Sequence, residues 1–145
     1  MEIALGSDHA GYSLKELIKQ HLQTQGVVCR DFGTFCENSI DYPDLALAVV
    51  NAVNEDHNLL GILVCGTGIG MAIAANKHAG IRAALCGDPF SARCARAHND
   101  ANILTLGARV IGPGLALDVV DQFIKTGFQG GRHQKRLDKI ALFEK

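Results

Sequence analysis

The stretch GILVCGTGIGMAIAANK, residues 61–77, passes from a short apolar run through a glycine-rich turn into an alanine-rich apolar segment. A short apolar run that ends in glycine is typical of a strand buried on both faces, here residues 61–65. The segment after the turn predicts a helix over residues 71–77. A buried strand, a tight turn and a helix in this order predict one unit of a parallel α/β sheet.

Four further apolar runs, each bounded by glycine or polar residues, predict the remaining strands. They cover residues 3–5, 27–32, 81–86 and 102–106. Because amphipathic stretches of helical period lie between them, the sequence predicts a three-layer α/β/α sandwich with a five-stranded parallel sheet, a Rossmann-like fold. A chain of 145 residues can bury one core, so residues 1–145 are expected to form a single domain.

Capping and proline signals predict where the helices begin. Ser13 and Glu16 have the spacing of a capping box. Asp88, which precedes a proline, is expected to be the N-cap of another helix. The other helix starts are expected at Pro43, Pro113 and Arg132.

Composition narrows the function classes. The formal net charge is -1 and no basic run occurs, so no nucleic-acid or membrane partner is expected. The chain begins with a short apolar strand, and neither a signal peptide nor a membrane span is predicted. Five cysteines without a Cys-x-x-Cys pair argue against a disulfide framework and a structural zinc site. We therefore expect a cytoplasmic protein with reduced cysteines.

The glycine-rich turn after residues 61–65 is the strongest candidate for a binding loop. Ligands of parallel α/β sheets bind beyond the carboxyl ends of the strands, and closely spaced glycines let amide N–H groups converge on an anion. A dinucleotide fingerprint would need glycine or alanine where Met71 stands. No Gly-Lys-Ser/Thr follows for a P-loop. A nucleotide-binding module nevertheless stays open as an alternative.

Cys65 stands at the end of this strand, directly before the loop and the start of a helix. Such a position favours the thiolate, which can act as a base. The alternative is an inert buried cysteine.

Three other polar motifs are candidates for the same site. Asp8 and His9 follow the first strand, although Asp8 could simply cap a helix. His98 lies in a polar turn and can exchange protons near pH 7, or be an ordinary surface histidine. Arg132 and Arg136 share one helix face, which suits a phosphate dianion but also occurs on solvated basic faces. Arg109, just past the last strand, is a further candidate.

Taken together, these motifs resemble one known family. Gly-Ser-Asp-His-Ala-Gly (residues 6–11), Asp-Tyr-Pro (41–43), Cys-Gly-Thr-Gly-Ile-Gly (65–70), His-Asn-Asp (98–100) and Gly-Gly-Arg-His-Gln-Lys-Arg (130–136) match ribose-5-phosphate isomerase B in order and spacing. The same superfamily includes galactose-6-phosphate and allose-6-phosphate isomerases. The resemblance implies an aldose–ketose isomerase that interconverts D-ribose 5-phosphate and D-ribulose 5-phosphate through a cis-enediolate, in the non-oxidative pentose phosphate pathway. It implies no metal and no cofactor.

The resemblance also assigns chemical roles. Cys65 would be the base that moves a proton between C1 and C2, and His98 would open the furanose ring. Part of the family has a glutamate in the following helix turn instead, but residues 69–72 contain no acid. The enediolate oxygens would be held by the Thr67 side chain and by the amides of Gly66, Thr67, Gly68, Ile69 and Gly70.

The remaining residues would bind the sugar phosphate. Asp8 would contact the ring hydroxyls and Asn99 the sugar. The phosphate would be held by His9, Arg109, Arg132 and Arg136.

A site shared between subunits is expected from topology and from the resemblance. Asp8 and Cys65 end strands, whereas His98 ends a helix that runs back to the opposite edge of the sheet. A homodimer, or a dimer of dimers, would bring His98 and Asn99 of one subunit to Cys65 of the other, and Arg109 is expected to cross with them. The alternative is one subunit of a hetero-oligomeric galactose-6-phosphate isomerase.

Overall fold

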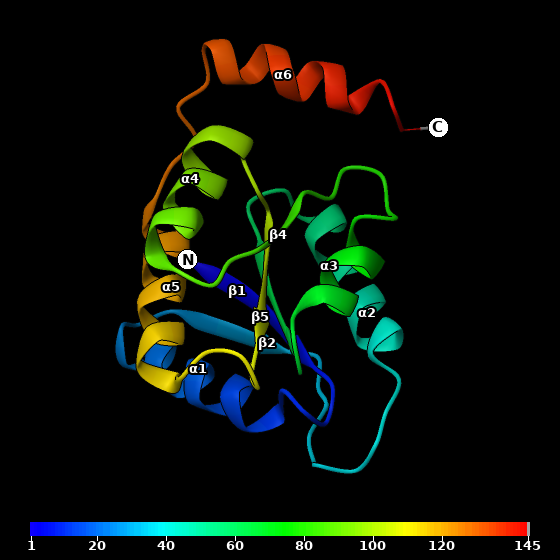
Figure 1. Ribbon diagram of the computed structural model, residues 1–145, viewed down its shortest axis with the longest axis vertical. Coiled ribbons are helices and arrows are strands. Elements are labelled where there is room, and N and C mark those ends of the chain that lie inside the picture. The colour runs from blue at the N-terminus through cyan, green and yellow to red at the C-terminus, as the bar shows by residue number, and fades with distance from the viewer. Residues whose placement is uncertain (145) are drawn as a thin grey trace.

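The computed structural model describes residues 1–144, and within them five strands form one all-parallel sheet (Figure 1). The strand order is β2-β1-β3-β5-β4. The strands are β1 (Glu2–Ser7), β2 (Val28–Asp31), β3 (Leu60–Cys65), β4 (Ala83–Leu85) and β5 (Ile103–Gly107). All five predicted strands are confirmed, although β4 is shorter than expected.

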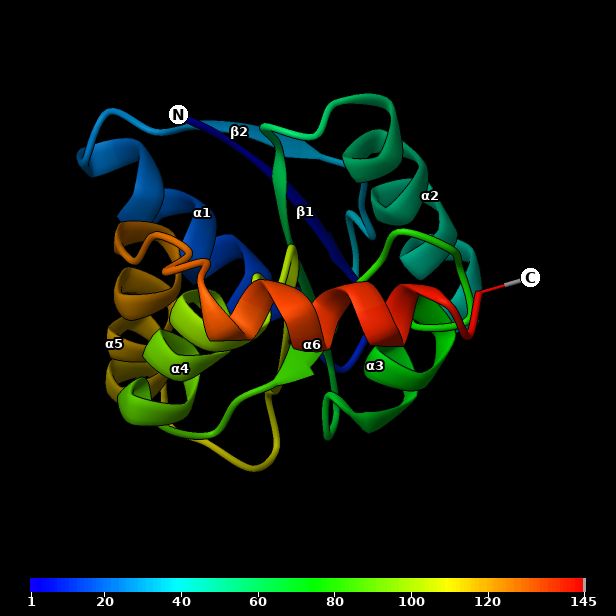
Figure 2. The same ribbon diagram turned by 90° about the horizontal axis from the view of Figure 1, so that it is seen from above.

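Helices cover both faces of this sheet, which confirms the predicted three-layer α/β/α sandwich (Figures 1 and 2). One face packs against α1 (Tyr12–Thr24), α4 (Pro89–Asn99) and α5 (Pro113–Lys125). The other packs against α2 (Tyr42–Glu55) and α3 (Ile69–Ala75). The last helix, α6 (Arg132–Ala141), crosses the end of the sheet where β4 and β5 begin, from the α4 side towards the α3 side (Figure 2). Among the helices of residues 1–144, none has the length and apolar character needed to cross a membrane.

Strand β3 shows why its sequence is continuously apolar. Ile62 and Val64 pack under α1, α4 and α5, whereas Leu63 and Cys65 pack under α2 and α3. Successive side chains of a strand point to opposite faces, so a central strand between two helix layers must be apolar at every position.

The helix starts confirm the proline signals but not the capping box. Proline occupies the first turn of α2, α4 and α5, and the Asp88 carboxylate accepts the Ser91 N–H at 2.7 Å, as expected for an N-cap. The capping box at Ser13 is wrong, because the N-cap is Gly11, two residues earlier, and the Ser13 hydroxyl donates to Glu37 instead. α3 also begins two residues before its predicted start.

An ion cluster ties α1 to β2 near the carboxyl edge of the sheet. Lys15 is fully buried, and its Nζ lies 2.7 Å from Asp31 Oδ2 and 2.8 Å from Glu16 Oε1. Lys19 Nζ also lies 2.7 Å from Asp31 Oδ2. Burial alone would raise the pKa of Asp31, but the hydrogen bonds from Lys15 and Lys19 outweigh it, and the pKa lies below its ordinary value. The cluster therefore depends on an ionised Asp31.

Candidate active site

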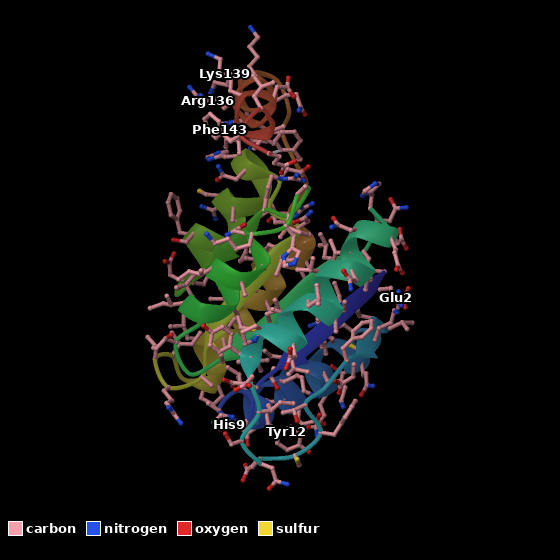
Figure 3. The ribbon with its side chains drawn as sticks, turned by 90° about the vertical axis from the view of Figure 1, so that its right-hand side faces the viewer. Glu2, His9, Tyr12, Arg136, Lys139 and Phe143 are labelled. Carbon is pink, nitrogen blue, oxygen red and sulfur yellow. The ribbon has the colours of Figure 1, made fainter. Side chains whose placement is uncertain are left out.

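The candidate residues fall into two groups at opposite edges of the sheet. The carboxyl-edge group follows the strand ends and consists of Asp8, His9, Cys65, Thr67 and Arg109. The amino-edge group lies at the end of α4 and on α6 and consists of His98, Asn99, Arg132, His133 and Arg136. Figure 3 shows the separation, with His9 at one end of the molecule and Arg136 at the other. One chain alone therefore does not bring the two groups together.

Cys65 is the best-defined member of the carboxyl-edge group. Its side chain is buried, with 5% of the residue exposed, and its Sγ accepts the Gly68 N–H at 3.1 Å. Gly68 has a φ of 78°, and a Cβ atom there would lie 2.5 Å from Leu85 Cδ1. Only glycine fits this conformation and this space, so the glycine is what turns an amide donor towards the sulfur. The sulfur thus has a fixed main-chain donor directed at it.

Strand β5 and the residue after it hold the loop that follows Cys65 through hydrogen bonds. The hydroxyl of Thr105, which is fully buried, donates to the Gly68 carbonyl at 2.9 Å. Ala108 N–H also donates to the Cys65 carbonyl at 2.9 Å. The sequence analysis did not select Thr105, although a threonine in the otherwise apolar run of β5 is a visible signal. A buried hydroxyl needs a partner, and here the partner is the loop that carries the donor to Cys65.

Arg109 lies beside the cysteine loop of its own chain. Its N–H donates to the Gly66 carbonyl at 3.0 Å, and a Cβ atom on Gly66 would lie 3.5 Å from Arg109 Nη1. The expectation that Arg109 crosses to the partner site with His98 is therefore wrong. The physical reason is that β5 is the direct neighbour of β3, so the residues after both strands meet at the same edge.

Asp8 and His9 lie where β1 joins α1. Asp8 is buried, and its Oδ1 accepts the Gly11 N–H at 3.0 Å. The N-cap of α1 is Gly11, so the carboxylate fixes the turn before the helix and does not cap it. His9 Nδ1 accepts the Ile40 N–H at 3.2 Å. A neutral His9 therefore carries its proton on Nε2, where it can donate to an anion. Both residues line a cavity of about 500 Å³ together with Ser39, Ile40, Asp41, Tyr42, Pro43 and Asp44.

Tyr42 is a second residue of this site to which the sequence analysis gave no role. A Cβ atom on Gly70 would lie 2.7 Å from Tyr42 Cζ, so the ring packs directly against the glycine loop. Because Tyr42 also lines the cavity beside Asp8 and His9, it connects the two halves of the carboxyl-edge group. Its sequence signal is the Asp-Tyr-Pro motif at the start of α2.

At the amino edge, the rings of His98 and His133 are stacked. Their centroids are 4.4 Å apart and their planes differ by 12°. His133 is buried, whereas Arg132 and Arg136 beside it are exposed. Burial lowers the pKa of His133, and the positive charges of His98, Arg132 and Arg136 lower it further. His133 is therefore neutral at pH 7.

The end of α4 that carries His98 and Asn99 is clamped by Asp100. This residue has a φ of 45°, which is uncommon for a residue other than glycine. Its carboxylate accepts hydrogen bonds from Arg96 Nη1 at 3.0 Å and Arg82 Nη2 at 3.3 Å. Arg82 Nε also donates to the Asp100 carbonyl at 2.8 Å. Two guanidinium groups thus fix the turn that follows His98 and Asn99.

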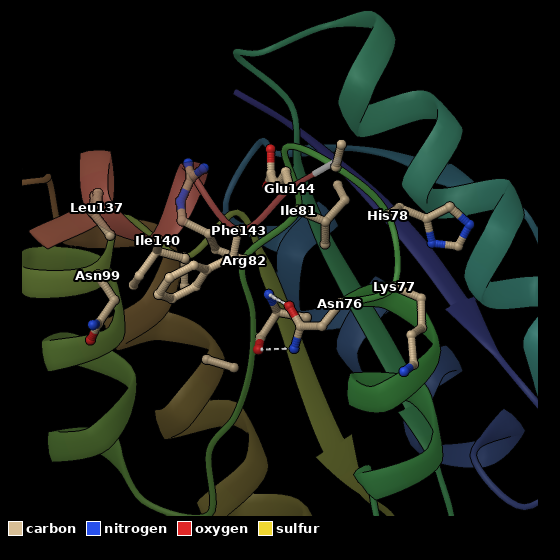
Figure 4. Close-up of a pocket in the computed structure, with 14 residues that line it drawn as sticks. Asn76, Lys77, His78, Ile81, Arg82, Asn99, Leu137, Ile140, Phe143 and Glu144 are labelled. Atoms are coloured by element: carbon tan, nitrogen blue, oxygen red, sulfur yellow. Dashed lines mark hydrogen bonds between the residues drawn. The ribbon is translucent and has the colours of Figure 1, made fainter.

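A second cavity, of about 630 Å³, opens between α6 and residues 76–84 (Figure 4). Asn99 and Arg82 line it on the polar side, and Leu137, Ile140 and Phe143 on the apolar side. Phe143 is largely exposed there. Of the amino-edge group, Asn99 is the member that lines this cavity.

Comparisons with known proteins identify the family. The model of the Ribose/Galactose Isomerase family matches residues 3–140. Ribose-5-phosphate isomerase B of Escherichia coli is 47% identical over 143 residues, which cover 99% of this chain and 96% of the relative.

Solved structures agree. Ribose-5-phosphate isomerase B of Clostridium thermocellum is 52% identical, with a TM-score of 0.97 over 99% of this chain and 97% of the other. The enzyme of Mycoplasma genitalium, solved with bound ribulose-5-phosphate, is 42% identical, with a TM-score of 0.94 over 99% and 95%. The resemblance found in the sequence is confirmed, and the chain belongs to the Ribose/Galactose Isomerase family.

Proposed function

We propose that this chain interconverts D-ribose 5-phosphate and D-ribulose 5-phosphate through a cis-enediolate, as a cytoplasmic step of the non-oxidative pentose phosphate pathway. The observation that carries the proposal is the buried Cys65 sulfur with the Gly68 N–H directed at it. The bound ribulose-5-phosphate of the Mycoplasma genitalium relative supports the choice of substrate.

Cys65 has the position needed to move the proton. Its thiolate takes the proton from C2 of open-chain ribose 5-phosphate, the C–H electron pair forms the C1=C2 bond, and the carbonyl π pair becomes negative charge on O1. The Cys65 thiol then returns a proton to C1, while the proton on O2 passes to O1 and C2 becomes the carbonyl carbon. Atoms and electrons balance without a metal or a cofactor.

The loop after Cys65 supplies donors for the charge on oxygen. The amides and the Thr67 hydroxyl belong to residues 66–70, which follow Cys65 directly, and Thr67 Oγ1 accepts the Ile69 N–H at 3.3 Å. A fixed donor at a developing oxyanion is worth about 3–4 kcal/mol by analogy with other enzymes. His9 Nε2–H and the Arg109 guanidinium lie at the same edge, where they would hold the phosphate and so keep C1 and C2 against the base.

We further propose that the working site is completed by a second copy of the chain. His98, Asn99, Arg132 and Arg136 belong to the opposite edge of the sheet, while Arg109 stays with Cys65. A two-fold partner would bring its amino-edge group to the carboxyl-edge group of the first chain, and the same contact would build two sites at once.

Apolar side chains beside the cysteine loop support this arrangement. Ile69 and Ile73 on α3 are both exposed, as is Leu85, which packs against Gly68. Exposed large apolar residues that gather next to a catalytic loop are typical of a surface covered by another chain. A dimer that covers these side chains would also shield the reacting atoms from water.

Substrate choice is tested with the purified chain alone. We expect kcat/KM to be highest for ribose 5-phosphate among ribose 5-phosphate, allose 6-phosphate and galactose 6-phosphate. One extra carbon usually changes discrimination by about 1–3 kcal/mol, so slower turnover of the larger sugars is compatible with the proposal. A preference for a six-carbon phosphate would contradict it. No turnover at all, with thermal stabilisation by nucleotides, would instead support a nucleotide-binding module.

Site sharing is tested by mixing two inactive variants, Cys65→Ala and His98→Asn. After random subunit exchange about half of the dimers are mixed, each with one intact site, so about a quarter of wild-type activity should return. The control is a mixture of each variant with itself. Verified exchange without recovery would place both residues in the pocket of one chain.

A further inference from the structure

His133 has no role in the chemistry proposed above, yet it is the one buried residue among the ten of α6. The arginines on either side of it, Arg132 and Arg136, point away into solvent. A helix that makes one buried contact would ordinarily use leucine or isoleucine for it. Here an imidazole occupies the position and lies flat on the ring of His98, at 4.4 Å and 12°.

The main chain holds the two rings in this relation. Gln129 N–H donates to the Ala97 carbonyl at 3.0 Å, which ties the segment before α6 to the residue before His98. His133 N–H donates to the Gly130 carbonyl at 3.0 Å and so closes the first turn of α6. On the C-terminal side of His98, the Asp100 carboxylate is held by hydrogen bonds from Arg82 and Arg96. The stack is therefore part of a hydrogen-bonded frame around His98.

We propose that His133 is a positioning residue, which holds the imidazole plane of His98 by stacking so that one ring nitrogen faces the substrate in the shared site. The inference rests on the proposed function, in which His98 opens the furanose ring. The χ2 torsion of histidine is broad, so a free ring would sample many planes. Proton transfer to a ring oxygen needs a nitrogen within hydrogen-bond reach and in line.

The electrostatics of the pair fit this role. The titratable and charged groups around His133 are Arg132 and Arg136 on α6 and His98 on α4, and burial together with these groups lowers the pKa of His133. A neutral ring can support a His98 that gains and loses a proton without adding a second charge to the stack. His133 thus provides a flat face and not a proton.

The test uses two variants that separate the flat ring from its nitrogens. His133→Phe keeps an aromatic face, and His133→Leu keeps apolar volume without one. In the free enzyme, stacking should shift the ring-proton NMR signals of His98 upfield. We expect this shift in the wild type and in His133→Phe, and its loss in His133→Leu. His57→Leu, the same change at an exposed histidine, should leave the His98 signals and the activity unchanged.

Kinetics then test whether the stack matters for ring opening. His133→Leu should lower kcat for ribose 5-phosphate by about tenfold or more, because small displacements of a catalytic group have effects of this size. Solvent proton exchange at C1 of ribulose 5-phosphate, which needs no ring opening, should stay within about twofold of wild type. His133→Phe should retain most of both rates, and thermal unfolding should show that both variants fold.

Several outcomes would overturn the proposal. Unmoved His98 signals in His133→Leu would show that the rings are not stacked in solution. Moved signals with unchanged kcat would show that the stack does not position His98 for catalysis. Equal losses in His133→Phe and His133→Leu would mean that a nitrogen of His133 is required. If the wild type itself failed to convert ribose 5-phosphate, the proposed function would fail, and the NMR comparison would still decide whether His133 holds His98.

Discussion

The carboxyl-edge group and the amino-edge group are held in place by different means. At the carboxyl edge, main-chain bonds fix the loop after β3 against the loop after β5, and a buried Thr105 hydroxyl holds the Gly68 carbonyl. At the amino edge, one main-chain bond from Gln129 to Ala97 is joined by side-chain contacts, the His98–His133 stack and the hydrogen bonds of Asp100. The amides that would hold an enediolate lie in the loop directly after β3 and in the first turn of α3. His98, which would open the ring, and Arg132 and Arg136, which would add to the phosphate site, lie on the helices α4 and α6.

The largest effect is expected from Cys65→Ala, which removes the proposed base from the carboxyl-edge group. Turnover should be nearly abolished, while substrate binding should stay within a few-fold, because the thiolate acts in the transition state and not on the phosphate. Single-turnover kinetics and titration with a substrate analogue measure the two quantities. Near wild-type activity in this variant would remove Cys65 from the mechanism.

The matching change in the amino-edge group is His98→Asn. It should damage turnover of cyclic ribose 5-phosphate far more than proton exchange at C1 of ribulose 5-phosphate, which has no furanose to open. NMR follows the exchange directly. If exchange falls as far as net turnover, the two groups do not divide ring opening and isomerisation between them.

A smaller effect is expected from Thr105→Val, which leaves the buried Gly68 carbonyl without its hydroxyl donor. The carbonyl keeps the Ala72 N–H at 3.1 Å as a donor, so the loss costs about 0.5–1.5 kcal/mol, and we expect kcat and C1 exchange to fall together by up to about tenfold. The matched control is Thr126→Val, which removes the same kind of bond, to the Gln122 carbonyl at 2.6 Å, at the end of α5. Equal kinetics in the two variants would show that Thr105 does not hold the donor loop in place.

The ion cluster gives the carboxyl edge a pH dependence of stability. Because the pKa of Asp31 in the folded chain lies below 3.8, its contribution is complete above that pH and is lost as the pH falls through the folded value. Asp31→Asn should lower the free energy of unfolding by about 3 kcal/mol at pH 7, since Lys15 stays buried with the partly exposed Glu16 as its remaining carboxylate partner.

Urea unfolding at pH 7 and below pH 3.8 measures the difference, which should shrink in acid. The control is Asp121→Asn, which breaks the more exposed pair with His21 at 2.8 Å and should cost about 1 kcal/mol or less. If the difference in free energy of unfolding between Asp31→Asn and wild type stayed constant with pH, the role assigned to ionised Asp31 would be contradicted.

Metal removal is expected to have the smallest effect, because neither the carboxyl-edge group nor the amino-edge group is proposed to use a metal. Prolonged EDTA treatment should leave the isomerase rate unchanged, because every step proposed above uses side chains and amides of the chain. A loss of rate that Mn²⁺ or Mg²⁺ restores would overturn the enediolate mechanism as written.

Local sequence signals were sufficient for most of the fold. Apolar runs predicted every strand, and prolines predicted the starts of α2, α4 and α5. The capping box failed because Ser13 found a tertiary partner in Glu37, which local spacing does not reveal. Topology placed Cys65 and His98 at opposite edges. The expectation for Arg109 was wrong, because Arg109 follows β5, which pairs with β3. Its place is set by this strand pairing and not by its nearness in sequence to His98.

The residues that the sequence left without a role share one property. Thr105, Tyr42 and His133 act through contacts with segments far away in the chain. A pattern of residue types can show that a threonine or histidine is unusual at its position, as it does for Thr105 in β5. It cannot show which loop or ring that residue will meet.

The burial of Cys65 has a practical consequence for chemical labelling. Cys36 is exposed, whereas Cys65 is 5% exposed, so a bulky maleimide or fluorophore should modify Cys36 first. The number of labels per chain would then say nothing about how many sites are competent. Cys29 and Cys94 are also more exposed than Cys65, so a background with serine at positions 29, 36 and 94 is needed. In that background a small reagent such as iodoacetate would turn the same reaction into a titration of Cys65.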